Sequence, residues 1–142
     1  MTLFGFSVPT ILLIAIAATA VLVYLPFALV GVARVQVGYN RDMRSSPRAT
    51  LDKLPEYGKR ATWAHQNSLE AFSLFSVAAL MAYVTQQDSA TVAWAAIAFV
   101  PIRFLYSVFY ILDVPLLRSL MFALGSTCII TLIGSSITST MR

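Results

Sequence analysis

The hydrophobic and polar positions of this chain are segregated into long segments, with four apolar runs separated by shorter polar stretches. The runs cover residues 8–33, 60–84, 90–112 and 116–137. Each is about 20 residues or longer, which is the length that an α-helix needs to cross the hydrocarbon core of a bilayer. The pattern predicts an all-α integral membrane protein, a bundle of four transmembrane helices in a single domain over residues 1–142.

The first apolar run, Val8 to Ala33, contains no charged residue. A cleaved signal peptide would need a basic segment before a shorter apolar core, and residues 1–6 carry no charge, so this run is interpreted as a retained span. Pro9 suits the start of a helix, whereas Pro26 should kink the helix or end it early.

Three polar segments connect the runs. Residues 34–59 form the only long loop, which Pro47, Pro55 and Gly58 interrupt. The sequence "TQQDS" at residues 85–89 predicts a tight turn, and "DVP" at residues 113–115 predicts another.

The composition agrees with a membrane protein. Hydrophobic residues make up 58% of the chain and charged residues 11%, against roughly 25% charged residues in ordinary soluble domains. The net charge of +4 would suit a nucleic-acid binder. However, seven of the ten basic residues cluster in one inter-span segment, which is the pattern of a topology signal with anionic lipid headgroups as partner. These residues are Arg34, Arg41, Arg44, Arg48, Lys53, Lys59 and Arg60.

The same charge distribution predicts the orientation of the spans. Short basic loops resist translocation, so the loop 34–59 should be cytoplasmic and both termini non-cytoplasmic, with Arg142 as a single charge against this assignment. The turn at Asp113 would then face the cytoplasm. A bacterial inner membrane and an internal eukaryotic membrane both fit this pattern.

Metal and disulfide chemistry find little support in the residue inventory. His65 is the only histidine and Cys128 the only cysteine, so the chain offers no Cys/His cluster for zinc and no disulfide framework. Cys128 lies in an apolar run and is interpreted as a buried small hydrophobe. A Ser–His–Asp triad lacks the nucleophile elbow that would indicate it.

Polar residues in the second run fall on one face of the expected helix. At about 100° per residue, four of them lie in a stripe about 80° wide, while His65 points elsewhere. The four residues are Arg60, Trp63, Asn67 and Glu70.

The third run repeats this arrangement, because Arg103, Tyr106 and Tyr110 share one helix face. Arg118 follows at the start of the fourth run. The predicted topology places all these groups at a similar depth near the cytoplasmic leaflet. Because intramembrane charges normally face a bundle interior or a wet cavity, the sequence predicts a polar cavity there.

Structural roles are also open for each of these residues. Arg60 could end a span and extend its charge to the headgroups. Asn67 and Glu70 could join helices by hydrogen bonds, and Glu70 could form a buried ion pair with Arg103. The two tyrosines could belong to an interfacial aromatic belt.

The stretch "RATWAHQNSLEAF", followed by "RFLYSVFY" and "LLRSLMF", resembles the MAPEG family, membrane-associated proteins of eicosanoid and glutathione metabolism. The resemblance covers essentially the whole chain. The family motif in the second span reads approximately R-x-x-R-A-x-x-N-x-x-E-x-x-P, and Arg60, Ala64, Asn67 and Glu70 stand in register with it. Arg103, Tyr106 and Tyr110 match the R-x-x-Y-x-x-x-Y pattern of the third span, and Arg118 occupies the place of the arginine in the fourth.

The resemblance implies a homotrimer of left-handed four-helix bundles that binds glutathione between neighbouring subunits. Asn67 and Glu70 would hold the tripeptide, Arg103 would support Glu70 or the charges of the ligand, and Tyr110 would line the pocket. Arg118 beside the thiol and Tyr106 are the catalytic candidates. Arg60 and Arg34 are further binding candidates.

The function that the resemblance implies is that of a glutathione-dependent transferase or peroxidase, which uses an activated thiolate on apolar electrophiles or lipid hydroperoxides. The chain departs from the family pattern at Trp63, where other members carry an arginine expected to grip a glutathione carboxylate. Ser73 replaces the usual proline, and Phe122 lies near a position often held by tyrosine. The alternatives are a non-enzymatic MAPEG-like membrane protein that has lost glutathione chemistry, or a small transporter, although the first span lacks the carboxylate that such transporters use.

Overall fold

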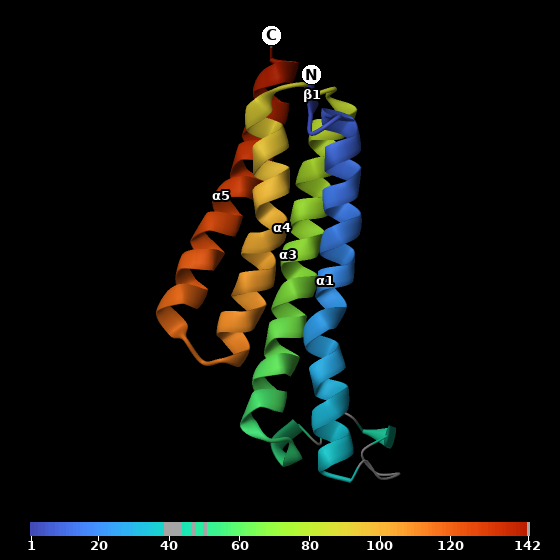
Figure 1. Cartoon of the computed structure of the whole chain (residues 1–142), viewed down its shortest axis with the longest axis vertical. Helices are drawn as coiled ribbons and strands as arrows, with labels where there is room; N and C mark the ends of the chain where they lie inside the picture. The colour runs from blue at the N-terminus through green and yellow to red at the C-terminus, as the bar shows by residue number, and fades with distance from the viewer. Residues whose placement is uncertain (39–43, 47, 50, 142) are drawn as a thin grey trace.

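The computed structural model describes residues 1–38, 44–46, 48–49 and 51–141. Four long helices pack as a bundle in this part of the chain, so the predicted all-α architecture is confirmed (Figure 1). They are α1 (Val8–Gln36), α3 (Glu56–Val84), α4 (Ala90–Ile111) and α5 (Pro115–Thr140). Arg41, Pro47 and Arg142, which entered the predictions of loop and topology, lie outside the described residues.

Two smaller elements accompany the bundle. A 3-10 turn, η1 (Leu51–Lys53), precedes α3. Strands β1 (Thr2–Leu3) and β2 (Phe6–Ser7) form an antiparallel hairpin that was not predicted. Its two turn residues, Phe4 and Gly5, both have positive φ, as the type I′ turn of a two-residue hairpin loop requires.

The four helices are long and apolar enough to cross a membrane, so the chain is a multi-pass integral membrane protein. Many of its large apolar side chains are exposed, as expected where lipid replaces water. The two ends of the described chain lie at one end of the bundle, and the described residues between α1 and α3 lie at the other (Figure 1).

Helix α1 passes through Pro26 and continues to Gln36, so it does not end early at the proline. His65 of α3 contacts this part of α1, because its Nδ1 lies 2.8 Å from the carbonyl oxygen of Val23. A carbonyl only accepts hydrogen bonds, so Nδ1 carries the proton. The ring of His65 also packs 5.0 Å from that of Phe27.

Close packing between α1 and α3 depends on small residues. A Cβ added to Gly58 would lie 2.7 Å from Cβ of Ala33, which is closer than two carbon atoms can approach. Ala61 and Ala64 are also fully buried on α3. Small side chains at such positions let two helices approach closely within a membrane.

The larger part of the core lies toward the termini, where all four helices contribute side chains. Phe75 of α3 and Phe99 of α4 stack there with their ring centroids 4.0 Å apart. Leu12 of α1 and Leu132 of α5 are fully buried in the same cluster. This apolar core closes one side of the polar site described next, because Phe99 contributes to both.

Candidate functional site

Arg103 and Asn67 join α4 to α3 inside the bundle. Nη2 of Arg103 donates one hydrogen bond to the main-chain oxygen of Asn67 and one to its Oδ1, each at 3.1 Å. Arg103 is only 5% exposed. Both residues were predicted to belong to a polar site, and the structure brings them into direct contact.

Glu70 is exposed and does not pair with Arg103. Among the described residues, the ion pairs within 4.0 Å join other groups, so the buried Glu70–Arg103 ion pair considered above is wrong. Asn67 accepts two hydrogen bonds from the buried guanidinium instead, and the exposed carboxylate of Glu70 is available to a ligand.

A pocket of about 220 Å³ lies between α3, α4 and α5, and these three polar residues form part of its wall. Ser126 adds a hydroxyl group from α5. The remaining lining residues are Ala71, Leu74, Phe99, Phe122, Gly125 and Ile129. The pocket therefore combines donors and acceptors at one side with an apolar wall, as small-molecule sites commonly do.

Two arginines and two tyrosines form a continuous series of contacts beside this pocket, which we call the Arg103–Arg118 stack. The guanidinium of Arg103 lies 4.2 Å from the ring centroid of Tyr106. The rings of Tyr106 and Tyr110 are 5.8 Å apart, and the guanidinium of Arg118 lies 4.7 Å from the ring of Tyr110. Each cation over a ring contributes about 0.5–2 kcal/mol.

The stack links the pocket to the α4–α5 turn. Tyr106 is buried and is not part of the pocket wall, whereas Tyr110 and Arg118 are half-buried. The structure therefore brings together the predicted residues of α4 and α5, but in a row rather than around one cavity. The catalytic roles of Tyr106 and Arg118 stay predictions.

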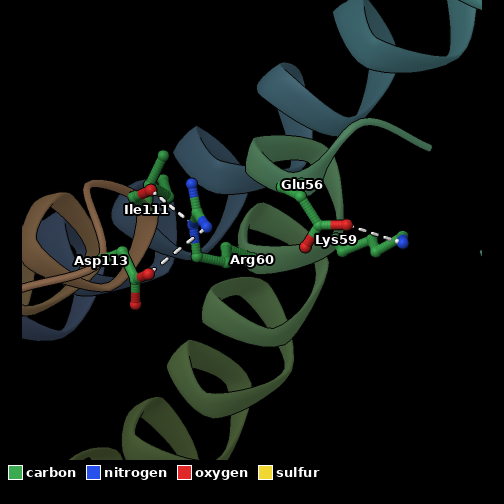
Figure 2. Close-up of polar contacts among 5 residues, drawn as sticks. All are labelled: Glu56, Lys59, Arg60, Ile111 and Asp113. Atoms are coloured by element: carbon green, nitrogen blue, oxygen red, sulfur yellow. Dashed lines mark hydrogen bonds and ion pairs between the residues drawn. The ribbon is translucent and has the colours of Figure 1, made fainter. Parts of the chain in front are cut away.

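Arg60 does not line the pocket. Its side chain extends from α3 to the end of α4 (Figure 2). Its Nε donates to the carbonyl oxygen of Ile111 at 2.9 Å, and its Nη1 lies 3.6 Å from a carboxylate oxygen of Asp113. The neighbouring Lys59 forms an ion pair within its own helix, with Glu56 at 2.9 Å (Figure 2). Arg60 thus contacts the turn between α4 and α5, and a ligand-binding role for it stays a prediction.

Arg34 and Trp63 also lie outside the pocket wall. Arg34 is half-buried in the last turn of α1, and its binding role stays a prediction. Trp63 is 42% exposed, so its ring is available to lipid or to another protein chain.

Residues of α5 that line the pocket escaped the sequence analysis, apart from Phe122. Gly125 stands seven residues after Arg118 and Phe122 four residues after it, spacings that share one helix face. The sequence signal for these two pocket residues was therefore their helical spacing from Arg118. Ser126 carries no such signal, because serine and threonine are frequent along the whole helix.

Within the residues that the structure describes, no group of three or more His, Cys, Asp or Glu side chains could hold a metal ion. The pocket offers an amide, a carboxylate, a guanidinium and a hydroxyl group. These donors and acceptors suit an organic ligand that carries both amino and carboxylate groups.

The fold and the site define a multi-pass membrane protein with a polar pocket among its spans. The chain belongs to the MAPEG family, whose family model matches residues 11–138. A search of curated proteins and a search of solved structures each found no match.

Proposed function

We propose that this protein is a glutathione-dependent membrane transferase or peroxidase that acts on apolar electrophiles or lipid hydroperoxides. The observation that supports it best is the pocket at which Asn67, Glu70 and Arg103 meet between three helices. Membership of the MAPEG family points in the same direction.

The polar groups of the pocket fit the functional groups of glutathione. The exposed carboxylate of Glu70 would accept hydrogen bonds from the amino group, as a charge-assisted contact. The amide nitrogen of Asn67 remains a donor for a peptide carbonyl, because its Oδ1 already accepts from Arg103. Arg103 and Ser126 would complete the binding of the polar backbone.

The volume of the pocket supports a site shared between subunits. Sites for drug-sized ligands measure about 300–1,000 Å³, whereas this pocket measures about 220 Å³ within a single chain. A tripeptide would therefore extend beyond it and contact a neighbouring copy. We propose a homotrimer in which the exposed Glu70 and Trp63 lie near such a boundary.

Activation of the thiol is assigned to the end of the Arg103–Arg118 stack. Glutathione bound there would supply a thiolate, which attacks an electrophilic carbon or reduces a hydroperoxide. The positive charge of Arg118 would lower the pKa of the thiol by favouring its anionic form. The hydroxyl of Tyr110 would donate a hydrogen bond to the same sulfur.

The apolar substrate would arrive through the bilayer, and glutathione from the cytoplasm. This requires the basic segment 34–59 to be cytoplasmic and both termini non-cytoplasmic. The described basic residues Arg44, Arg48 and Lys53 support this orientation, because they belong to one segment between α1 and α3.

Calorimetric titration of the purified protein with glutathione tests the proposal, together with thiolate absorbance near neutral pH. We expect saturable binding at millimolar concentrations or below, accompanied by a rise in thiolate absorbance. No binding would reject glutathione chemistry and leave the second candidate, a non-enzymatic member of the family. The neutral, exposed side chain of Trp63, in place of the expected arginine, is the observation that favours this candidate.

A further inference from the structure

The contact between Arg60 and the α4–α5 turn completes the C-terminus of α4. Two backbone hydrogen bonds close the turn. The N–H of Val114 donates to the carbonyl of Phe109 at 2.9 Å, and the N–H of Asp113 donates to the carbonyl of Tyr110 at 3.3 Å. This is the Schellman arrangement. It leaves the carbonyl of Ile111 without a backbone donor, and residue 115 is a proline, which has no N–H.

Arg60 supplies the missing donor from another helix. Its Nε binds the carbonyl of Ile111 at 2.9 Å, and its charge lies at the negative end of the α4 dipole. The same guanidinium pairs with Asp113 (Figure 2). We call these two interactions the Arg60 clasp.

Asp113 occupies a backbone position that usually requires glycine. Its φ is +60°, in the left-handed region, which costs a residue with a side chain about 1 kcal/mol. Glycine would close the same turn without this cost but would remove the carboxylate that pairs with Arg60. The side chain at this position is therefore better explained by the clasp than by the turn.

The clasped turn lies between the last two members of the Arg103–Arg118 stack, Tyr110 and Arg118. Tyr110 immediately precedes Ile111, and its carbonyl accepts the hydrogen bond from Asp113. Arg118 stands in the first turn of α5, with its N–H bonded to the carbonyl of Val114. Any shift of the turn would therefore change how the guanidinium of Arg118 lies over the ring of Tyr110.

We propose that Arg60 is a positioning residue, which acts from α3 through the α4–α5 turn to hold Arg118 against Tyr110. The proposal rests on the proposed function in that this pair is the thiol-activating end of the site. It assigns Arg60 no contact with the ligand, in keeping with its place outside the pocket wall.

The kinetics of Arg60→Gln test whether Arg60 supports thiol activation, with Lys59→Gln as the control. Lys59 precedes Arg60 and its ammonium pairs with Glu56 on the same helix, so its variant removes one charge from the same helix turn without touching the α4–α5 turn contacts of Arg60. We expect Arg60→Gln to lower kcat about tenfold, a barrier change of about 1.4 kcal/mol, with little change in the KM for glutathione. The pH midpoint of the rate should move to higher pH, and Arg60→Lys should restore part of the loss. A raised KM with unchanged kcat, or kinetics like those of Lys59→Gln, would overturn the proposal.

Distance measurements test the same inference without glutathione. Nitroxide labels are placed at two exposed positions, Leu116 on α5 and Val77 on α3, in a Cys128→Ser background. Labelled chains are diluted with unlabelled ones, so that the measured distance lies within one chain and reports the position of the turn. Arg60→Gln should broaden or shift the distance distribution, and Lys59→Gln should leave it unchanged. If the wild-type protein fails to bind glutathione, the proposed function is rejected, and these distances still decide whether Arg60 fixes the turn. An unchanged distribution in Arg60→Gln would show that it does not.

Discussion

Arg103 and Asn67 are joined through a single nitrogen atom, because Nη2 of the arginine donates to both the main-chain oxygen and Oδ1 of the asparagine at 3.1 Å. A buried guanidinium usually needs a carboxylate or several acceptors to offset its loss of hydration. Here an amide and a main-chain carbonyl serve, together with the ring of Tyr106. This arrangement ties α3 to α4 and keeps the nearby carboxylate of Glu70 available.

The first prediction concerns this contact. Asn67→Ala removes the side-chain acceptor from a buried charged donor, so the free energy of unfolding should fall by about 1–3 kcal/mol. Unfolding by SDS in mixed micelles measures the loss. Ser73→Ala is the matched control, since Ser73 is exposed and its hydroxyl donates within its own helix, to the carbonyl of Leu69. Equal stability of the two variants would contradict the assignment.

Glu70→Gln tests the carboxylate as a ligand contact. Replacing the charged acceptor with an amide should weaken glutathione binding about tenfold or more, with little effect on stability because Glu70 is exposed. Calorimetry compares it with Glu56→Gln, an exposed carboxylate on the same helix that pairs with Lys59 outside the pocket. If both variants bind like the wild type, Glu70 has no direct part in binding.

Arg118→Gln should change the pH dependence of the reaction. The rate rises with pH as the bound thiol ionises, and a nearby positive charge lowers the pKa of that thiol. Removing the charge raises the pKa, so the pH midpoint of kcat should move upward and the deficit should be largest at low pH. A pH–rate series measures this, with Lys53→Gln as an exposed basic control outside the site. A deficit equal at every pH would argue against thiolate activation.

Gly58→Ala tests the approach of α1 to α3. The added methyl group would lie 2.7 Å from Cβ of Ala33, so the helices must separate, at a cost of about 1–3 kcal/mol. Gly31→Ala on α1 is the control, because its Cβ would meet no atom within 4 Å and should stabilise the helix by about 0.5–1 kcal/mol. SDS unfolding compares the two. A neutral Gly58→Ala would show that the interface adapts.

The all-α membrane fold was accessible from the sequence because each helix follows from its own apolar length. The pairing of Asn67 with Arg103 was partly accessible, since helix periodicity placed each on a polar face and topology placed both at a similar depth. Periodicity does not say what a long side chain reaches. Arg60 and Asn67 shared one predicted stripe, yet Arg60 extends to Ile111 and Asp113 while Asn67 meets Arg103.

The sequence by itself determined how many segments enter the bilayer and which helix faces carry polar groups, because hydropathy and helix repeat are local properties. Only the tertiary structure decided that Glu70 stays exposed, that Tyr106 is buried beneath Arg103, and that the α4–α5 turn requires a donor from α3. Those outcomes depend on distances between helices, which packing at small residues such as Gly58 sets and which no single segment encodes.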